Sequence, residues 1–247
     1  LPDFFGLHCG LTTGACATAA AKAALYKILY GEEIPSMEIQ LPSGEPVVLS
    51  VASVEADETG VACSVIKEAG DDPDVTNGCR IKVHVSVVDG ETEEEPLIRF
   101  QAGPGVGTVT LPGLGLDVGG PAINQTPRRM METELHRLVV ASGRKISSIW
   151  VTVSVEHGEE LAKRTFNPKL GIVGGISIIG TSGIVRPFSS EAFVASIRKE
   201  VQVAKAVGCS QLVINSGAKS ERYLKTYLAD RSIPQQGFVH YGNFIGA

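Results

Sequence analysis

The sequence lacks the paired cysteines on which a disulfide framework depends. Its 247 residues contain five cysteines, an odd number, and no two of them form a C-x-x-C pair. This pattern is typical of reduced thiols, which persist in reducing compartments. We therefore expect free cysteines and a cytoplasmic protein.

Long apolar segments and targeting signals are also missing. The longest apolar run, residues 170–185, is too short and too rich in glycine for a membrane-spanning helix, and no signal peptide is visible. We expect no membrane partner. The chain starts at Leu1 without a methionine and stops at NFIGA, so we expect residues to be missing from both ends.

The sequence has fewer basic than acidic residues. With 22 Lys and Arg against 27 Asp and Glu, the formal net charge is -5, which argues against a general binder of nucleic acids or membrane surfaces. Any anionic substrate must therefore meet a local basic patch. The oligomeric state does not follow from these properties, and a homo-oligomer stays open.

The most informative stretch that is present is residues 166–187, FNPKLGIVGGISIIGTSGIVRP. It contains five glycines, many Ile and Val residues, and only two charges, Lys169 and Arg186. Such a segment is expected to be buried, with its backbone close to another backbone or a ligand. We interpret it as the floor of a site at the seam between two architectures.

The pattern on either side of this floor segment predicts the fold class. Strand-like stretches dominate before it, and helix and strand alternate after it. We expect an α+β domain over residues 1–188 that binds the substrate, followed by a smaller α/β domain over residues 189–247. In the second part, QLVINSG, AKSERYLKTYLAD and GFVHYGNFIG predict a βαβ unit with a parallel sheet.

An alanine-rich helix is predicted from about residue 13 to 30, with Thr12 or Thr13 as N-cap and Gly31 as its end. Two interpretations of its first turn stay open. Free backbone N–H groups, hydroxyls and the positive helix end would bind an anion. An ordinary capped helix explains the same residues.

The loop KEAGDDPDVTNG brings Asp71, Asp72 and Asp74 close together. They are candidates for acid/base chemistry, although turn formation by Asp and Asn explains them too. Its spacing departs from a calcium-binding EF-hand, and we expect no metal site. His157, beside a glycine turn at a strand end, is a further candidate, and a structural histidine is the alternative.

Two more stretches carry anion-binding features. Within the glycine-rich residues 101–120, the glycine motif continues as strand or loop at Thr108 to Pro112 and not as a helix, so it does not fit a dinucleotide fingerprint, although such loops also form anion-binding nests. Arg128 and Arg129 fall in the first turn of a helix predicted to run to about Ser142. Positive charge beside a helix N-terminus is unfavourable, which points to an anion bound nearby. Two arginines that are simply solvated are the alternative.

Five motifs occur in order along the chain: TTGACATAAAKAA, AGDDPDVT, GPGVGTVT, PAINQTPR and the floor segment. Together they resemble the CbiD family of cobalamin biosynthesis, from Thr12 to Arg186 and more loosely to Ile245. The resemblance implies a methyltransferase that uses S-adenosylmethionine to methylate C1 of cobalt-precorrin-5B, giving cobalt-precorrin-6A in anaerobic cobalamin biosynthesis.

A physical interpretation of the residues fits the implied reaction. The substrate is a broad ring with many carboxylates, and arginine suits carboxylate contacts. We therefore expect it to contact two groups of residues, the helix start (Thr12, Thr13, Gly14, Cys16) and the basic side chains (Arg128, Arg129, Lys169, Arg186).

We expect the methyl donor at the strand ends of the βαβ unit, next to the floor, because ligands of parallel sheets bind there. The predicted residues are Gly174, Gly175, Asn215, Ser216, Gly217, Gly242 and Asn243. Methyl transfer depends mainly on orientation, and no nucleophile is required.

Two other function classes compete with this prediction. A non-catalytic carrier would hold the corrinoid intermediate without binding S-adenosylmethionine. A phosphotransferase would use GPGVGTVT as a phosphate loop, but this stretch lacks the P-loop lysine and the Ser/Thr spacing of a P-loop.

Overall fold

The computed structural model describes residues 3–4, 6–90 and 95–241. Its centre is a five-stranded sheet in which β12 pairs in parallel with β9 and all other neighbours are antiparallel. In sheet order the strands are β6 (Ser53–Ala56), β7 (Val61–Ile66), β8 (Arg80–Asp89), β12 (Ile146–Val155) and β9 (Leu97–Ala102). Burial alternates along β8 and β12, so each strand turns one row of side chains to the core.

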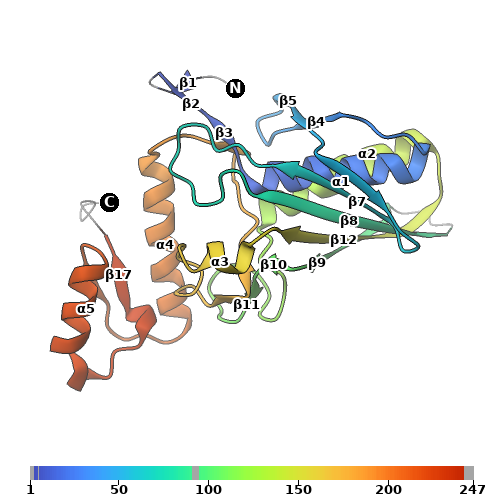
Figure 1. Ribbon diagram of the computed structural model, residues 1–247. Coiled ribbons are helices and arrows are strands. Elements are labelled where there is room, and N and C mark those ends of the chain that lie inside the picture. The colour runs from blue at the N-terminus through green and yellow to red at the C-terminus, as the bar shows by residue number, and fades with distance from the viewer. Residues whose placement is uncertain (1–2, 5, 91–94, 242–247) are drawn as a thin grey trace.

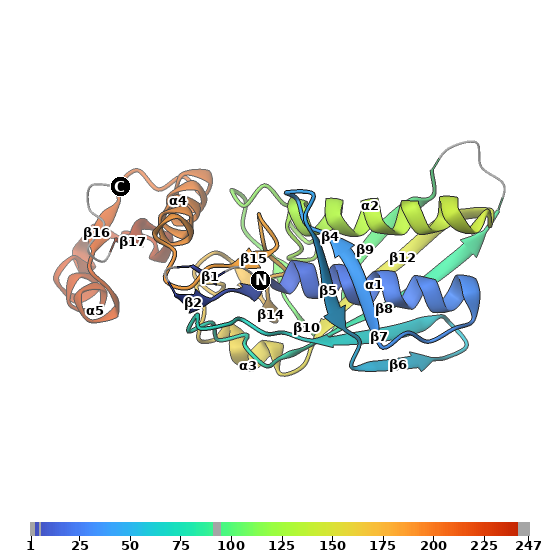
Figure 2. The ribbon, with the colours of Figure 1, turned by 90° about the horizontal axis from the view of Figure 1, so that it is seen from above.

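Two helices, α1 (Thr13–Tyr30) and α2 (Gln125–Ser142), lie side by side over this sheet (Figures 1 and 2). The buried alanines of α1 have small side chains, which let the helix lie close to β7 and β8. The predicted caps are confirmed: Thr12 Oγ1 accepts the Ala15 N–H, and Gly31 ends α1 in a left-handed conformation.

A hairpin follows α1, in which β4 (Ser36–Gln40) pairs antiparallel with β5 (Pro46–Ser50). Further short strands are β1 (Asp3–Phe4), β2 (Leu7–His8), β3 (Gly10–Leu11), β10 (Gly105–Val106) and β11 (Thr108–Val109). A short helix, α3 (Gly158–Ala162), follows β12.

The floor segment, residues 166–187, forms three short strands that pair with distant parts of the chain. β13 (Ile172–Val173) pairs with β11, β14 (Gly175–Ile176) with β10, and β15 (Ile184–Val185) with β3. The expected close backbone approach is therefore confirmed. Full burial is not, because Val173 and Ile179 are exposed.

The rest of the described chain forms α4 (Ser190–Ala206), β16 (Val213–Asn215), α5 (Ala218–Tyr227), two 3-10 turns (Ala229–Arg231 and Gln235–Gly237) and β17 (Phe238–His240). The parallel pairing of β16 with β17 confirms the predicted βαβ unit. Both views place this part at one end of the molecule (Figures 1 and 2).

The fold is a mixed α/β arrangement, and α4 packs against elements that precede it in the chain. Val203 of α4 is buried in a small core with Val109, Leu114, Ala122 and Ile172 of the preceding part. Lys199 also donates to the Leu114 carbonyl at 3.1 Å. The proposed division at residue 188 stays a prediction.

All five cysteines are free thiols, as expected, and burial raises the pKa of Cys16 to about 12. None of the helices within the described ranges combines the length and hydropathy needed to cross a bilayer.

Candidate functional site

A group of charged side chains lies where the floor segment meets the C-terminal elements. We call Lys169, Glu200, Glu221, Lys225 and His240 the seam cluster. Lys169 belongs to the floor segment, Glu200 to α4, Glu221 and Lys225 to α5, and His240 to the end of β17. The cluster therefore joins four stretches that are far apart in the sequence.

Lys169 is the buried centre of this cluster. Its Nζ lies 2.7 Å from Glu200 Oε2 and 3.5 Å from Glu221 Oε2, and its side chain is 10% exposed. These are ion-pair distances, yet within the described residues this Nζ makes no hydrogen bond of acceptable direction. Its charge is thus neutralised while its three N–H donors lack well-aligned acceptors, which is costly in a buried position.

Glu221 connects the cluster to the βαβ unit. Its carboxylate pairs with Lys225 at 2.6 Å and with the His240 imidazole Nε2. Burial raises the pKa of Glu221, but the hydrogen bonds from Lys225 and His240 and the charge of Lys169 outweigh it and hold the pKa below its ordinary value. Glu221 is therefore an anion at neutral pH.

The cluster lies at the carboxyl ends of the parallel strands, because His240 closes β17 and Glu221 follows the end of β16 by one turn of helix. Asn215, the last residue of β16, donates from Nδ2 to Val239 O at 3.0 Å and accepts the Gly217 N–H at 3.1 Å. These bonds fix the turn between β16 and α5. Gly217 has φ 139°, and an added Cβ there would meet no atom of residues 3–4, 6–90 or 95–241 within 4 Å.

Sequence reasoning found one member of the cluster, Lys169, and missed the others. Glu200, Glu221 and Lys225 occupy helix positions that read as ordinary solvated charges, and His240 sits in a strand-like stretch. The available signal was the predicted βαβ unit itself, because its first helical turn and its second strand end meet at one edge of the sheet.

The first turn of α1 differs from the anion-binding expectation. The N–H of Thr12 donates to Gly183 O at 3.0 Å and that of Gly14 to Ile179 O at 2.9 Å, while Thr13 Oγ1 accepts the Ile179 N–H at 2.9 Å. With the Ala15 N–H taken by Thr12, the floor segment and the cap already use these groups. The expectation of free amides there was wrong at Thr12, Gly14 and Ala15, and Cys16 is buried.

The three loop carboxylates serve as structural acceptors. Asp71 accepts the His8 N–H at 2.7 Å, and Asp72 accepts the Phe188 N–H at 3.1 Å. Asp74 pairs with the fully buried Lys67 at 2.8 Å and accepts the N–H and hydroxyl of Thr76. The turn-forming alternative is thus confirmed for Asp74, and an acid/base role for the three carboxylates stays a prediction.

The other predicted polar residues lie apart from the seam cluster. His157 has a 74% exposed side chain and a positive φ of 55° before α3. Arg128 donates to Ile123 O at 2.8 Å and lies 5.4 Å from the centre of the Phe100 ring, so carbonyl groups and an aromatic ring stabilise it without an anion. Arg129 and Arg186 are exposed.

The predicted donor-site glycines have different surroundings. An added Cβ at Gly175 would lie 2.3 Å from the Gly105 carbonyl carbon, whereas Gly174 is open and has φ 82°. Asn167 joins the start of the floor segment to this point, since its Nδ2 donates to Gly175 O at 3.0 Å. Ser216 donates its N–H to Ser220 Oγ. Gly242 and Asn243 lie outside the described residues.

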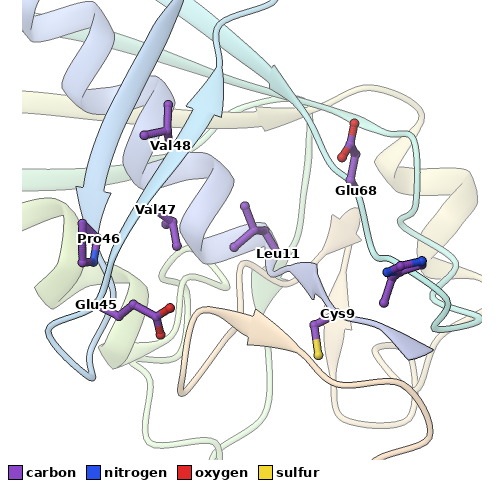
Figure 3. Close-up of a pocket in the computed structure, with 8 residues that line it drawn as sticks. Cys9, Leu11, Glu45, Pro46, Val47, Val48 and Glu68 are labelled. Atoms are coloured by element: carbon purple, nitrogen blue, oxygen red, sulfur yellow. The ribbon is translucent and has the colours of Figure 1, made fainter. Parts of the chain in front are cut away.

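A cleft of about 490 Å³ lies in the N-terminal part, between β5 and the β2–β3 stretch (Figure 3). Its lining includes apolar Leu11 and Val47, the thiol of Cys9, and the carboxylates of Glu45 and Glu68. Two carboxylates make it a poor match for a polyanionic ligand. Among the residues described, no three His, Cys, Asp or Glu side chains gather as a group that could hold a metal ion.

Comparison with known proteins identifies relatives along nearly the whole chain. A protein named cobalt-precorrin-5B C(1)-methyltransferase from Prosthecochloris aestuarii is 47% identical over 241 residues, which is 98% of this chain and 64% of that protein. One of the same name from Salinispora tropica is 45% identical over 98% of this chain and 61% of its own length. The chain thus spans less than two thirds of the length of these relatives.

A solved structure agrees with these relatives. The crystal structure of cobalamin biosynthesis protein CbiD from Archaeoglobus fulgidus superimposes with a TM-score of 0.56 and 28% identity, covering 91% of this chain and 68% of that one. The CbiD family model matches residues 3–187. The chain therefore belongs to the CbiD family, as the five ordered motifs predicted.

Proposed function

We propose that this protein is an S-adenosylmethionine-dependent C-methyltransferase that methylates C1 of cobalt-precorrin-5B to give cobalt-precorrin-6A. The observation that carries the proposal is the 47% identity over 98% of the chain to a protein named for this reaction. Its five free cysteines favour a reducing compartment, and we place the protein in the cytoplasm.

The methyl donor belongs at the carboxyl ends of β16 and β17 in this proposal. The chemistry of the residues there fits it, because the seam cluster has charges of both signs and Gly217 leaves the turn open. When bound, S-adenosylmethionine supplies an electrophilic methyl group on a sulfonium. The residues of the chain then have to bind the methyl donor and the corrinoid, orient the methyl group toward the ring carbon, and shield both ligands from water.

The corrinoid belongs on the other side of the floor segment, against the N-terminal part. The exposed arginines Arg129 and Arg186 are suited to its carboxylates. Gly174 presents an exposed backbone without a side chain, which permits the flat approach of a ring. The strand pairing of β13, β14 and β15 holds this surface rigid between the two ligands.

A labelled-methyl assay tests the proposal. Purified full-length protein is incubated with S-adenosylmethionine that carries a labelled methyl group and with cobalt-precorrin-5B. We expect label in the corrinoid product together with S-adenosylhomocysteine. Binding of both ligands without any transfer of label contradicts the enzyme proposal.

The carrier alternative makes a different prediction in the same experiment. A carrier would bind the corrinoid and show no measurable affinity for S-adenosylmethionine. The mixed charges at the strand ends favour the methyltransferase over the carrier. In a carrier for a polyanionic ring, two glutamates beside the lysines would repel the carboxylates of the ring.

A further inference from the structure

The first turn of α5 is at least partly exposed, and its Glu221 belongs to the seam cluster. This ten-residue helix begins after Gly217, and no side chain in the described part of the chain caps it. Ser220 Oγ accepts the Ser216 N–H instead of an amide of the helix. The turn therefore presents backbone N–H groups and the positive end of the helix dipole.

Lys169 gives a second, independent indication of a ligand at this turn. Its Nζ lies 3.5 Å from Glu221, which is in the first turn of α5, and it makes no well-directed hydrogen bond within the described ranges. A buried ammonium with unused donors is expected to have a further acceptor. A ligand carboxylate placed between Lys169 and the α5 amides supplies one.

The charge balance of the cluster selects the kind of ligand. The two lysines Lys169 and Lys225 offset the two glutamates Glu200 and Glu221, so these four side chains together carry no net charge. A polyanion such as the corrinoid would be repelled by the two glutamates. A zwitterion is matched at both ends, since its carboxylate meets Lys169 and the helix amides while its ammonium meets Glu221.

We infer that the seam cluster and the α5 N-terminus form the subsite for the amino-acid end of the methyl donor, recognising its α-carboxylate and α-ammonium together. The inference rests on the proposed function. Lys169 and Glu221 are then specificity residues for the donor, in addition to joining the floor segment to α5.

Two ligands separate this role from a structural one. S-adenosylhomocysteine has the amino-acid end, whereas 5′-methylthioadenosine lacks it but keeps the nucleoside and sulfur. Calorimetric titrations of the full-length protein measure the affinity for each ligand. Lys169→Met is expected to weaken the binding of S-adenosylhomocysteine by about tenfold, which is the effect of one charge-assisted bond. Its affinity for methylthioadenosine is expected to stay within about twofold of that of the unsubstituted protein. The exposed Lys145→Met serves as the matched control and is expected to change neither affinity.

A second measurement covers the case in which Lys169→Met does not fold. The unsubstituted protein is titrated with S-adenosylhomocysteine and with its decarboxylated analogue, and at least about tenfold weaker binding of the analogue is expected. Equal affinity of the unsubstituted protein for S-adenosylhomocysteine and its decarboxylated analogue overturns the subsite alone. So does an equal loss of affinity for S-adenosylhomocysteine and methylthioadenosine in Lys169→Met. A failure of the unsubstituted protein to bind S-adenosylhomocysteine overturns the donor proposal as well.

Discussion

Gly105 and Gly175 face each other across the parallel pair of β10 and β14, and their backbones leave no room for a side chain. An added Cβ at Gly175 would lie 2.3 Å from the Gly105 carbonyl carbon. The floor segment thus depends on glycine for contact between two backbones, as well as for any approach of a ligand. This contact fixes the segment against the end of the main sheet.

Gly175→Ala is expected to destabilise the protein strongly, because the backbone of β10 has to move. We predict a loss of roughly 3 kcal/mol or more in the free energy of unfolding, measured by denaturant titration. The Cβ of the neighbouring Gly174→Ala meets no described atom within 4 Å and adds only the strain of its φ of 82°, so this variant should cost about 1 kcal/mol. Similar costs for the two variants would contradict the packing account.

Asp74→Asn is expected to leave the buried Lys67 ammonium without its anion and to lower the free energy of unfolding by about 3 kcal/mol at pH 7. Burial raises the pKa of Asp74, but hydrogen bonds from Lys67 and Thr76 outweigh it and lower the pKa. Because the pKa of this carboxyl is lower in the folded than in the unfolded protein, its ionisation stabilises the fold fully above the unfolded pKa of about 3.9. This stabilisation is lost as the pH falls through the folded pKa. The difference between the two proteins should shrink below about pH 4, and a constant difference would refute the ion-pair explanation.

Thiol alkylation should distinguish the cysteines. Burial raises the pKa of Cys16 to about 12 and of Cys63 to about 11, and both side chains are almost fully enclosed. They are protonated at pH 8, and only a thiolate reacts readily. With iodoacetamide and peptide mass spectrometry, the partly exposed Cys209 should be modified first. Early modification of Cys16 in folded protein would show that the start of α1 is less closed than described.

Arg128 and Arg129 form a matched pair for substrate binding. Arg128 is held by the Ile123 carbonyl and the Phe100 ring, so Arg128→Met should cost about 1 kcal/mol of stability. Arg129 is exposed, so Arg129→Met should change the free energy of unfolding by no more than about 0.5 kcal/mol. The same variant should bind the corrinoid about tenfold more weakly. Thermal unfolding and corrinoid absorbance titrations measure the two effects. Unchanged affinity in Arg129→Met would remove it from the predicted binding residues.

Local patterns in the sequence predicted the elements whose causes are local. The caps at Thr12 and Gly31 and the β16–α5–β17 unit all follow from residues close to one another in the chain. Their boundaries moved by only a few residues in the structure.

Contacts between distant residues could not be predicted in this way. Lys169 meets Glu200 and Glu221, 31 and 52 positions further on, and nothing in their local sequence distinguishes these glutamates from solvated ones. The conflict of Arg128 with the start of α2 pointed to an anion, yet the turn before the helix directs the Ile123 carbonyl to its guanidinium. Both outcomes depend on the path of the chain in space.

A crystal structure of the full-length protein with S-adenosylhomocysteine tests the proposed position of the methyl donor most directly. We predict the ligand at the ends of β16 and β17, with its carboxylate between Lys169 and the first turn of α5. Density for the ligand in the N-terminal cleft beside Cys9 and Glu68 would contradict the claim.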